Sequence, residues 1–214
     1  MNLCNASALE NAMLGLYRSI ERLLPGLSKK IIQFIASREG EGASTIAGEF
    51  GRVVAGRLGR PALILDADGA APKKWLQPGN ITEHGWEEML KIDALGELGR
   101  ALCHVGGPAL RAIPLSGPLT HEMANSPQME KFLCGLKERF DFILVDSPAV
   151  AASPDGLAFC RNADGVVLVL EAESTRWPVA EYSKELIVKN GGRLLGSVFN
   201  KRRYHIPEFI YRRL

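Results

Sequence analysis

The chain has 214 residues and a formal net charge of +2, and 46% of its residues are hydrophobic and 23% charged. These values are typical of a soluble globular protein, so they exclude a disordered chain, a collagen-like repeat and a disulfide-rich miniprotein. Its apolar runs, such as residues 166–170, are far shorter than the roughly 18 residues of a membrane span, and the N-terminus lacks the order of a secretory signal. We therefore expect a cytoplasmic protein.

A first helix is predicted over residues 7–24. Ser7 and Glu10 form an S-x-x-E capping box, and apolar residues recur at helical spacing until Pro25 and Gly26. This segment precedes the strand-rich part of the chain, so we interpret residues 1–27 as an N-terminal helical extension.

Short apolar runs then alternate with helical patterns. Each run is rich in aliphatic and β-branched residues and is apolar on both alternating faces, as in a parallel strand that is covered on both sides; the runs are residues 31–36, 62–65, 142–145, 166–170 and 194–199. Helical spacing occupies residues 46–58 and 129–140. The alternation predicts one α/β domain over residues 28–200, with a doubly wound, mainly parallel sheet.

The last segment, residues 201–214, is basic and aromatic. It carries five Lys or Arg residues and one Glu, which is too little charge for a general nucleic-acid binder. Two interpretations stay open: a surface for lipid headgroups or for a partner, or a final helix, beginning at Pro207, that packs on the domain.

The cysteines show no pattern of a metal or disulfide framework. There is no C-x-x-C spacing and no paired histidine, so we expect reduced thiols in the core; the cysteines are Cys4, Cys103, Cys134 and Cys160.

A glycine-rich turn, SREGEGAST over residues 37–45, joins the first predicted strand to the following helix. Such a turn exposes backbone N–H groups and the positive end of a helix dipole, both of which favour a phosphate. Gly42 and Ser44 fit the P-loop pattern G-x-x-x-x-G-K-[ST], whereas Ser37 and Ala43 replace its first glycine and its lysine. A turn that merely caps a helix remains the alternative.

Aspartates close two of the predicted strands. Asp66 and Asp68 follow residues 62–65, and Asp146 follows residues 142–145. One such aspartate can simply cap a helix, but three of them beside a glycine-rich loop point to Mg²⁺ held directly or through water. Because ligands of doubly wound sheets bind at the carboxyl ends of the strands, these residues predict a magnesium-nucleotide site.

The chain resembles the cytoplasmic domain of bacterial protein-tyrosine kinases of capsule and exopolysaccharide synthesis, within the P-loop ATPases. Residues 38–45 (REGEGAST) resemble the family's P-G-E-G-K-S-T, residues 63–68 (LILDAD) its second Walker motif, and residues 145–148 (VDSP) its Walker B motif. Residues 84–86 (HGW) and 114–118 (PLSGP) resemble a further family segment and a glycine-proline loop. The resemblance implies the three-layer sandwich of a P-loop NTPase.

The same resemblance implies ATP or ADP with Mg²⁺ as cofactors. Asp66 would be the acidic catalytic residue that helps activate the acceptor hydroxyl or water, and Mg²⁺ would be bound by Ser44, Asp68 and Asp146. Other residues would contact the nucleotide, with the last near the base: Arg38, Gly40, Glu41, Gly42, Ala43, Ser44, Thr45 and Asn200.

The chain departs from the family at a residue that takes part in phosphoryl transfer. Ala43 replaces the Walker A lysine, whose ammonium normally reaches the β- and γ-phosphates. Because phosphoryl transfer depends on positioning and electrostatics, we expect a rate loss on the order of 10²–10³ or more. Arg38 stands where positioning ATPases carry an extra lysine, and it is the candidate replacement cation together with Lys73 and Lys74.

Two further departures concern assembly and phosphorylation. The family's ring-forming helix carries E-x-x-R-x-x-R, and alignment on Arg18 places Gly15 and Glu21 at the other two positions. The family's tyrosine cluster, phosphorylated by neighbouring subunits, is reduced to Tyr204 and Tyr211.

These observations predict a nucleotide-binding, tyrosine-kinase-like regulator of exopolysaccharide or capsule polymerisation and export that is catalytically weak or inactive, a pseudokinase. The alternatives are an active tyrosine autokinase, a positioning-type ATPase and a nucleotide-free scaffold. The expected partner is a membrane-bound chain-length or co-polymerase protein, which would bring the chain to the inner face of the cell membrane. A homo-oligomer and a peripheral membrane contact of the tail are further expectations; no nucleic-acid partner is expected.

Overall fold

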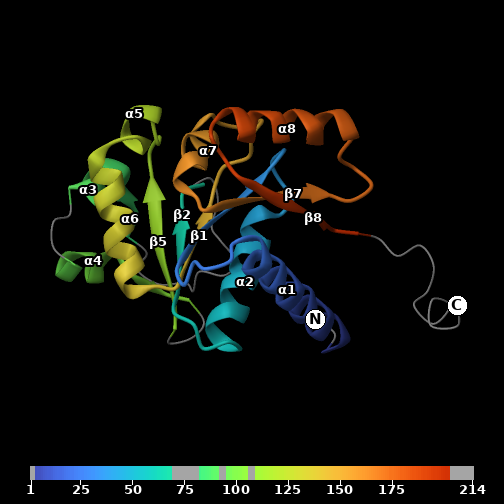
Figure 1. Ribbon diagram of the computed structural model, residues 1–214, viewed down its shortest axis with the longest axis horizontal. Coiled ribbons are helices and arrows are strands. Elements are labelled where there is room, and N and C mark those ends of the chain that lie inside the picture. The colour runs from blue at the N-terminus through green and yellow to red at the C-terminus, as the bar shows by residue number, and fades with distance from the viewer. Residues whose placement is uncertain (1–2, 69–81, 92–94, 106–108, 203–214) are drawn as a thin grey trace, which may run out of the picture.

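The computed structural model describes residues 3–68, 82–91, 95–105 and 109–202 (Figure 1). The helices are α1 (Leu3–Leu23), α2 (Ala43–Gly56), α3 (Trp86–Leu90), α4 (Leu95–Ala101), α5 (His121–Ala124), α6 (Pro127–Arg139), α7 (Asp155–Ala158) and α8 (Trp177–Lys189). The strands are β1 (Lys30–Ala36), β2 (Ala62–Asp66), β3 (His84–Gly85), β4 (Cys103–His104), β5 (Leu110–Ser116), β6 (Phe142–Asp146), β7 (Gly165–Glu171) and β8 (Leu194–Asn200).

The strands form one sheet in the order β3-β5-β2-β6-β1-β7-β8, and β4 pairs with β5. All described pairs are parallel except β4 with β5. The doubly wound, mainly parallel sheet expected from the sequence is therefore confirmed. In this arrangement the carboxyl ends of β1, β2, β6 and β7 lie along one edge.

Helices cover both faces of the sheet, which makes three layers. Every residue of β1, β2 and β6 is buried, and alternate side chains enter opposite cores. Ile32 and Phe34 belong to the core under α1 and α2, whereas Ile31 and Ile35 pack on the other side. Figure 1 shows α1 and α2 on one side and α6 and α8 on the other.

The first helix starts earlier than its capping box predicts. It runs from Leu3, so Ser7 lies inside the helix and is not its N-cap. No glycine or proline separates residues 3 and 7, and nothing in the local chain therefore stops the helix from continuing toward the N-terminus.

Residues 114–116 belong to β5 and not to the loop that the resemblance implied. Pro114 lies beside Asp66 of β2, but on the outer side of β5 the partner changes there, from β4 at Ala112 to β3 at Leu115. A proline is tolerated in a strand where no ladder partner needs its N–H.

The described cysteines are free: Cys103, Cys134 and Cys160. Only Cys160 is a core thiol, and burial raises its pKa to about 12. Cys134 is exposed, which corrects the expectation that these thiols lie in the core, because Cys134 falls on the outer side of the amphipathic helix α6.

Helix α1 is anchored on the domain by an apolar stripe and by charge. Met13 and Ile20 are buried in the core that α1 shares with α2. The ammonium of Lys30, 1% exposed, forms an ion pair of 3.0 Å with Glu21 and also donates to a backbone carbonyl. Arg60 pairs with the same Glu21 carboxylate at 3.1 Å. Glu21, which stands where the family carries an arginine, is thus engaged within its own chain.

Candidate nucleotide site

The glycine-rich loop follows β1, and its last three residues, 43–45, form the first turn of α2. Gly42 is the N-cap of α2 with φ 99°, in the left-handed region. A Cβ at Gly42 would collide with the side-chain amide of Asn200 at the end of β8. The backbone conformation therefore favours glycine, and any other residue would also displace the Asn200 amide from the loop. Ala43 is the first residue of α2, so the N-terminus of a 14-residue helix opens at the place predicted for phosphate.

Glu41 is buried within this loop, with 3% of its surface exposed. Its carboxylate accepts hydrogen bonds from the backbone N–H groups of Ser37 and Arg38, at 2.8 and 3.0 Å, and from the Ser37 hydroxyl. A further donor is the hydroxyl of Thr175, between β7 and α8. The Glu41 backbone carbonyl accepts from Asn200 Nδ2 at 2.9 Å. The loop is thus joined to the ends of β7 and β8.

The pKa of the Glu41 carboxyl is lowered from its ordinary value of 4.5. Burial by itself raises the pKa, but the hydrogen bonds from Thr175, from the Arg38 N–H and from Ser37 outweigh it. Bonds to the charged form favour that form, so Glu41 is an anion at neutral pH.

Two buried carboxylates stand side by side at the carboxyl edge. Asp66 of β2 and Asp146 of β6 are register partners, and they are 5% and 0% exposed. By strand alternation they share the sheet face of Ile64 and Leu144, which pack in the core with α2. The predicted catalytic residue and one predicted metal ligand therefore lie on the face that carries the loop.

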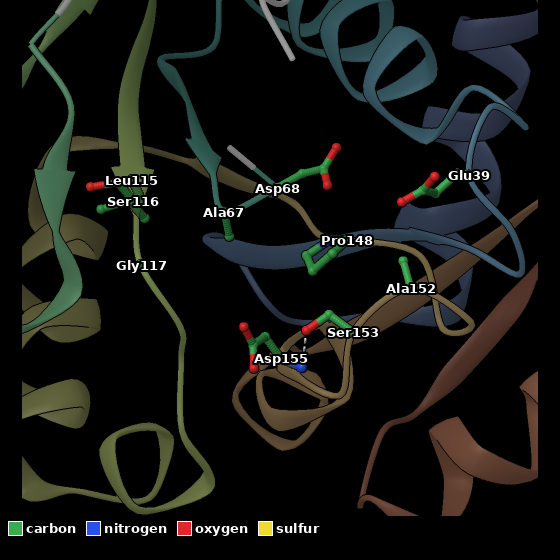
Figure 2. A pocket seen from close by; sticks show the side chains of 10 residues that line it. All are labelled: Glu39, Ala67, Asp68, Leu115, Ser116, Gly117, Pro148, Ala152, Ser153 and Asp155. Atoms are coloured by element: carbon green, nitrogen blue, oxygen red, sulfur yellow. Dashed lines mark hydrogen bonds between the residues drawn. The ribbon is translucent and has the colours of Figure 1, made fainter. Parts of the chain in front are cut away.

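Asp68 lies just beyond β2, where it lines a cavity of about 320 Å³ at the ends of β2, β5 and β6. Figure 2 shows the acidic side chains Glu39, Asp68 and Asp155 around this cavity, each from a different segment. The Asp155 N–H donates to Ser153 Oγ at 3.1 Å. Sequence reasoning missed both of the other acids: Glu39 lies in the glycine-rich turn but at a position that the P-loop pattern leaves unspecified, and Asp155 belongs to no motif that signals a site.

The remaining predicted residues stand as follows. Arg38 and Thr45 are exposed, Gly40 is exposed with φ 81°, and Ser44 is partly exposed. Tyr204, Tyr211, Lys73 and Lys74, as well as Pro207, lie outside the described residues. The contacts bring Asn200 to the loop and Asp66 to Asp146; the nucleotide and metal roles themselves stay predictions.

The donor set suits Mg²⁺ in chemical type. Ser44, Asp66, Asp68 and Asp146 offer only oxygen ligands, which this hard cation prefers. Among the described residues, no group of three or more His, Cys, Asp or Glu could hold a metal ion. Mg²⁺ commonly needs only one or two carboxylates together with substrate phosphates and waters, so the residues fit a magnesium-nucleotide complex.

Comparison with known proteins identifies relatives, although no protein-family model matches the chain. Tyrosine-protein kinase CpsD of Streptococcus agalactiae is 28% identical over 181 residues, which cover 82% of this chain and 77% of that protein. Succinoglycan biosynthesis transport protein ExoP of Rhizobium meliloti is 27% identical over 209 residues, 92% of this chain but only 25% of that longer protein. The chain is thus similar in sequence to bacterial tyrosine-protein kinases and to a polysaccharide transport protein.

The fold is consistent with this similarity. The kinase domain of the Escherichia coli tyrosine kinase ETK superposes with a TM-score of 0.74 and 18% identity, covering 92% of this chain and 79% of that domain. The architecture is that of a P-loop NTPase, as the resemblance implied. In the part of the chain that the structure describes, the helices are all too short or too polar to span a membrane.

Proposed function

We propose that this chain is a nucleotide-binding, tyrosine-kinase-like regulator of exopolysaccharide or capsule polymerisation and export, with weak or no phosphoryl transfer. The observation that carries the proposal is that the loop keeps the backbone of a phosphate-binding site but lacks its lysine. Gly42 and the start of α2 have the form that a phosphate-binding loop needs, while Ala43 stands where the transferring phosphate would meet a lysine.

In the proposed site, Mg·ADP or Mg·ATP binds at the α2 N-terminus. Backbone N–H groups of residues 42–45 and the helix dipole bind the phosphates, Ser44 and Asp146 serve Mg²⁺ with Asp68 nearby, and Asn200 lies near the base. Bound Mg²⁺ neutralises phosphate charge. Asp66 orients the acceptor hydroxyl or water and accepts its proton.

The loss of the lysine weakens catalysis more than binding. Removing one preorganised charge stabiliser costs on the order of 10²–10³ in rate, whereas the backbone donors of the loop remain in place without the lysine. Ala43 contributes a buried methyl group, 7% exposed, to the core under α2, and no charge.

For the partner we propose a membrane-bound chain-length or co-polymerase protein. Support comes from ExoP, a transport protein of succinoglycan biosynthesis, in which the matched region is a quarter of a longer chain. Binding to such a partner would hold this chain at the inner face of the cell membrane. We include self-association in the proposal because Arg18 keeps one position of the family's ring motif and its side chain is exposed.

The test is calorimetric titration of ADP and ATP with Mg²⁺ into the wild-type chain, Asp146→Asn and Ala43→Lys. We expect micromolar binding by the wild type, weaker binding by Asp146→Asn, and ATP turnover that rises about 10²–10³-fold in Ala43→Lys. Circular dichroism confirms that each variant is folded. Absence of binding by both wild type and Ala43→Lys would refute nucleotide binding and favour the scaffold.

A second candidate, an active autokinase, is favoured by Arg38. This side chain is exposed at the loop and could supply a cation, although a forked guanidinium is not equivalent to an ammonium. Incubation with Mg·ATP and the membrane partner would then phosphorylate Tyr204 or Tyr211, and Arg38→Gln would abolish it. Mass spectrometry that finds both tyrosines unmodified in the wild-type complex eliminates this candidate.

A further inference from the structure

Glu41 and Glu39 lie in the same loop but point in different directions. Glu39 is exposed and lines the acidic cavity (Figure 2). Glu41 is 3% exposed and is surrounded by donors from its own chain. Gly40 between them has φ 81°, a left-handed conformation that redirects the backbone. The loop thus carries one outward and one inward carboxylate.

The inward carboxylate joins segments far apart in the sequence. Ser37 and Arg38 donate to it from the beginning of the loop, and Thr175 donates from a position 134 residues away. Asn200, 159 residues away, bonds the carbonyl of the same residue. One distant donor, Thr175, lies in the segment that follows β7, and the other, Asn200, ends β8; these two strands are neighbours in the sheet.

We propose that Glu41 is a positioning residue: with Thr175 it forms a clamp that holds the loop in its phosphate-ready shape. The role of the clamp in nucleotide binding rests on the proposed function. The hydrogen bonds that form the clamp do not depend on it. Hereafter, the clamp means the Glu41 carboxylate and the Thr175 hydroxyl.

The contacts of Glu41 argue against a direct role in nucleotide binding. Its carboxylate is already an acceptor for four hydrogen bonds and is anionic, so it would repel a phosphate and not bind it. A buried carboxylate is stable only while such partners are present. Its effect on a nucleotide must therefore pass through the loop, whose N–H groups at the start of α2 keep their positions because the preceding residues are fixed.

The clamp lies close to the start of α8. Thr175 is two residues before Trp177, the first residue of α8, which is 74% exposed. When Glu41 holds Thr175, the segment between β7 and α8 is held against the loop. A change in the loop is then transmitted to this exposed helix start, and a change there is transmitted back.

The experiment compares Thr175→Val, Thr175→Ser and Glu41→Gln with wild type. Valine keeps the shape of threonine without its donor, and serine restores the donor. Glu39→Gln is the matched control, because it removes the same charge from the same loop. Hydrogen–deuterium exchange is followed for residues 37–45 and 171–177 without ligand, and for β1 and β6 as a measure of global stability. Mg·ADP affinity is measured in parallel.

We expect exchange in both segments to accelerate about tenfold or more in Thr175→Val and Glu41→Gln, the scale of a lost bond to a charged group, while β1 and β6 remain protected. Thr175→Ser should exchange like wild type, and Glu39→Gln should leave the loop unchanged. Thr175→Val, which keeps the charge of Glu41, should weaken Mg·ADP binding several-fold, and Thr175→Ser should restore it.

The clamp is refuted if loop exchange in Thr175→Val and Glu41→Gln equals that of wild type, if serine does not rescue, or if β1 and β6 lose protection equally. Wild type that fails to bind Mg·ADP refutes the proposed function instead, and the ligand-free exchange still decides on the clamp.

Discussion

At the nucleotide loop, the backbone conformation of single residues limits which side chains the loop can carry. Gly40 and Gly42 both have positive φ, 81° and 99°. Space distinguishes them: a Cβ at Gly40 would meet nothing within 4 Å, whereas one at Gly42 would collide with the Asn200 amide. A side chain at Gly40 would therefore cause conformational strain alone, whereas one at Gly42 would cause both strain and a steric collision.

We predict that Gly42→Ala lowers stability more than Gly40→Ala. Both substitutions carry the left-handed cost of about 1–2 kcal/mol, but only Gly42→Ala also displaces Asn200 and breaks its bond to the Glu41 carbonyl. Urea unfolding measures both. Adding Asn200→Ala to each variant should narrow the difference; an unchanged difference would show that the collision is not its cause.

The lowered pKa of Glu41 predicts a specific acid dependence. Because the folded-state pKa lies below the ordinary value of 4.5, ionised Glu41 contributes stability above pH 4.5, and this contribution is lost as the pH falls through the folded-state pKa. The stability difference between wild type and Glu41→Gln should thus be constant from about pH 7 to pH 5 and shrink below that. Urea unfolding at several pH values measures it, and a difference that instead grows on acidification would contradict the assignment.

Among the elements, α1 depends most clearly on charge for its position. Its residue Glu21 pairs with the buried Lys30 and with Arg60, and Arg60 in turn pairs with Asp141 before β6 at 3.1 Å. Arg60 also lies over the ring of Phe142, 4.8 Å from its centroid. The helix is therefore fixed to the amino ends of the strands by a network and not by apolar contact alone.

We predict that Glu21→Gln lowers the free energy of unfolding by about 1–3 kcal/mol, because a buried ammonium loses its charge partner. The control is Glu10→Gln, on the same helix, whose partner Arg57 is 69% exposed; its loss should be about 1 kcal/mol or less. Urea denaturation compares the two. Equal losses would mean that the network does not depend on the burial of Lys30.

At the scale of the whole molecule, the strand order assembles the site. β1 lies between β6 and β7, so the loop that follows it has Asp146 on one side and Thr175 on the other. The site therefore draws on the ends of strands that are distant in sequence, and it depends on the fold of the entire sheet.

We predict that nucleotide binding stabilises the whole domain. A ligand at one hundred times its Kd adds about 2.7 kcal/mol when it binds only the folded state, so Mg·ADP should raise the melting temperature of the wild type. The rise should be smaller in Asp146→Asn and should require Mg²⁺. Thermal unfolding monitored by circular dichroism measures it, and an equal rise with and without Mg²⁺ would argue against a magnesium-nucleotide site.

The amino-acid sequence determined which segments form the buried strands and which polar residues come at the ends of these strands. The runs that became β1, β2, β6 and β7 are apolar on both faces, as in strands of a covered sheet. The run at β8 was expected to be covered in the same way, but β8 is a partly exposed edge strand in which Phe199 is 68% exposed. The sequence also determined that Asp66 and Asp146 lie at the carboxyl ends of strands and that Gly42 lies in the loop after one. Parallel strands place such residues at one edge, so the location of the candidate site could be predicted from spacing.

Only the tertiary structure decided how these side chains are used. Local patterns hold no information on pairing partners, so the strand at Pro114, the inward direction of Glu41 and the acids Glu39 and Asp155 around one cavity could not be predicted. The partner of Glu41, Thr175, is 134 residues away, and packing of β7 against β1 brings the two together. Glu41 lies two residues before the expected phosphate site at Ala43, so the motif alone predicts that its carboxylate contacts the nucleotide. The structure shows instead that buried hydrogen-bond donors surround Glu41, which the sequence cannot reveal, and that Glu41 therefore stabilises the loop.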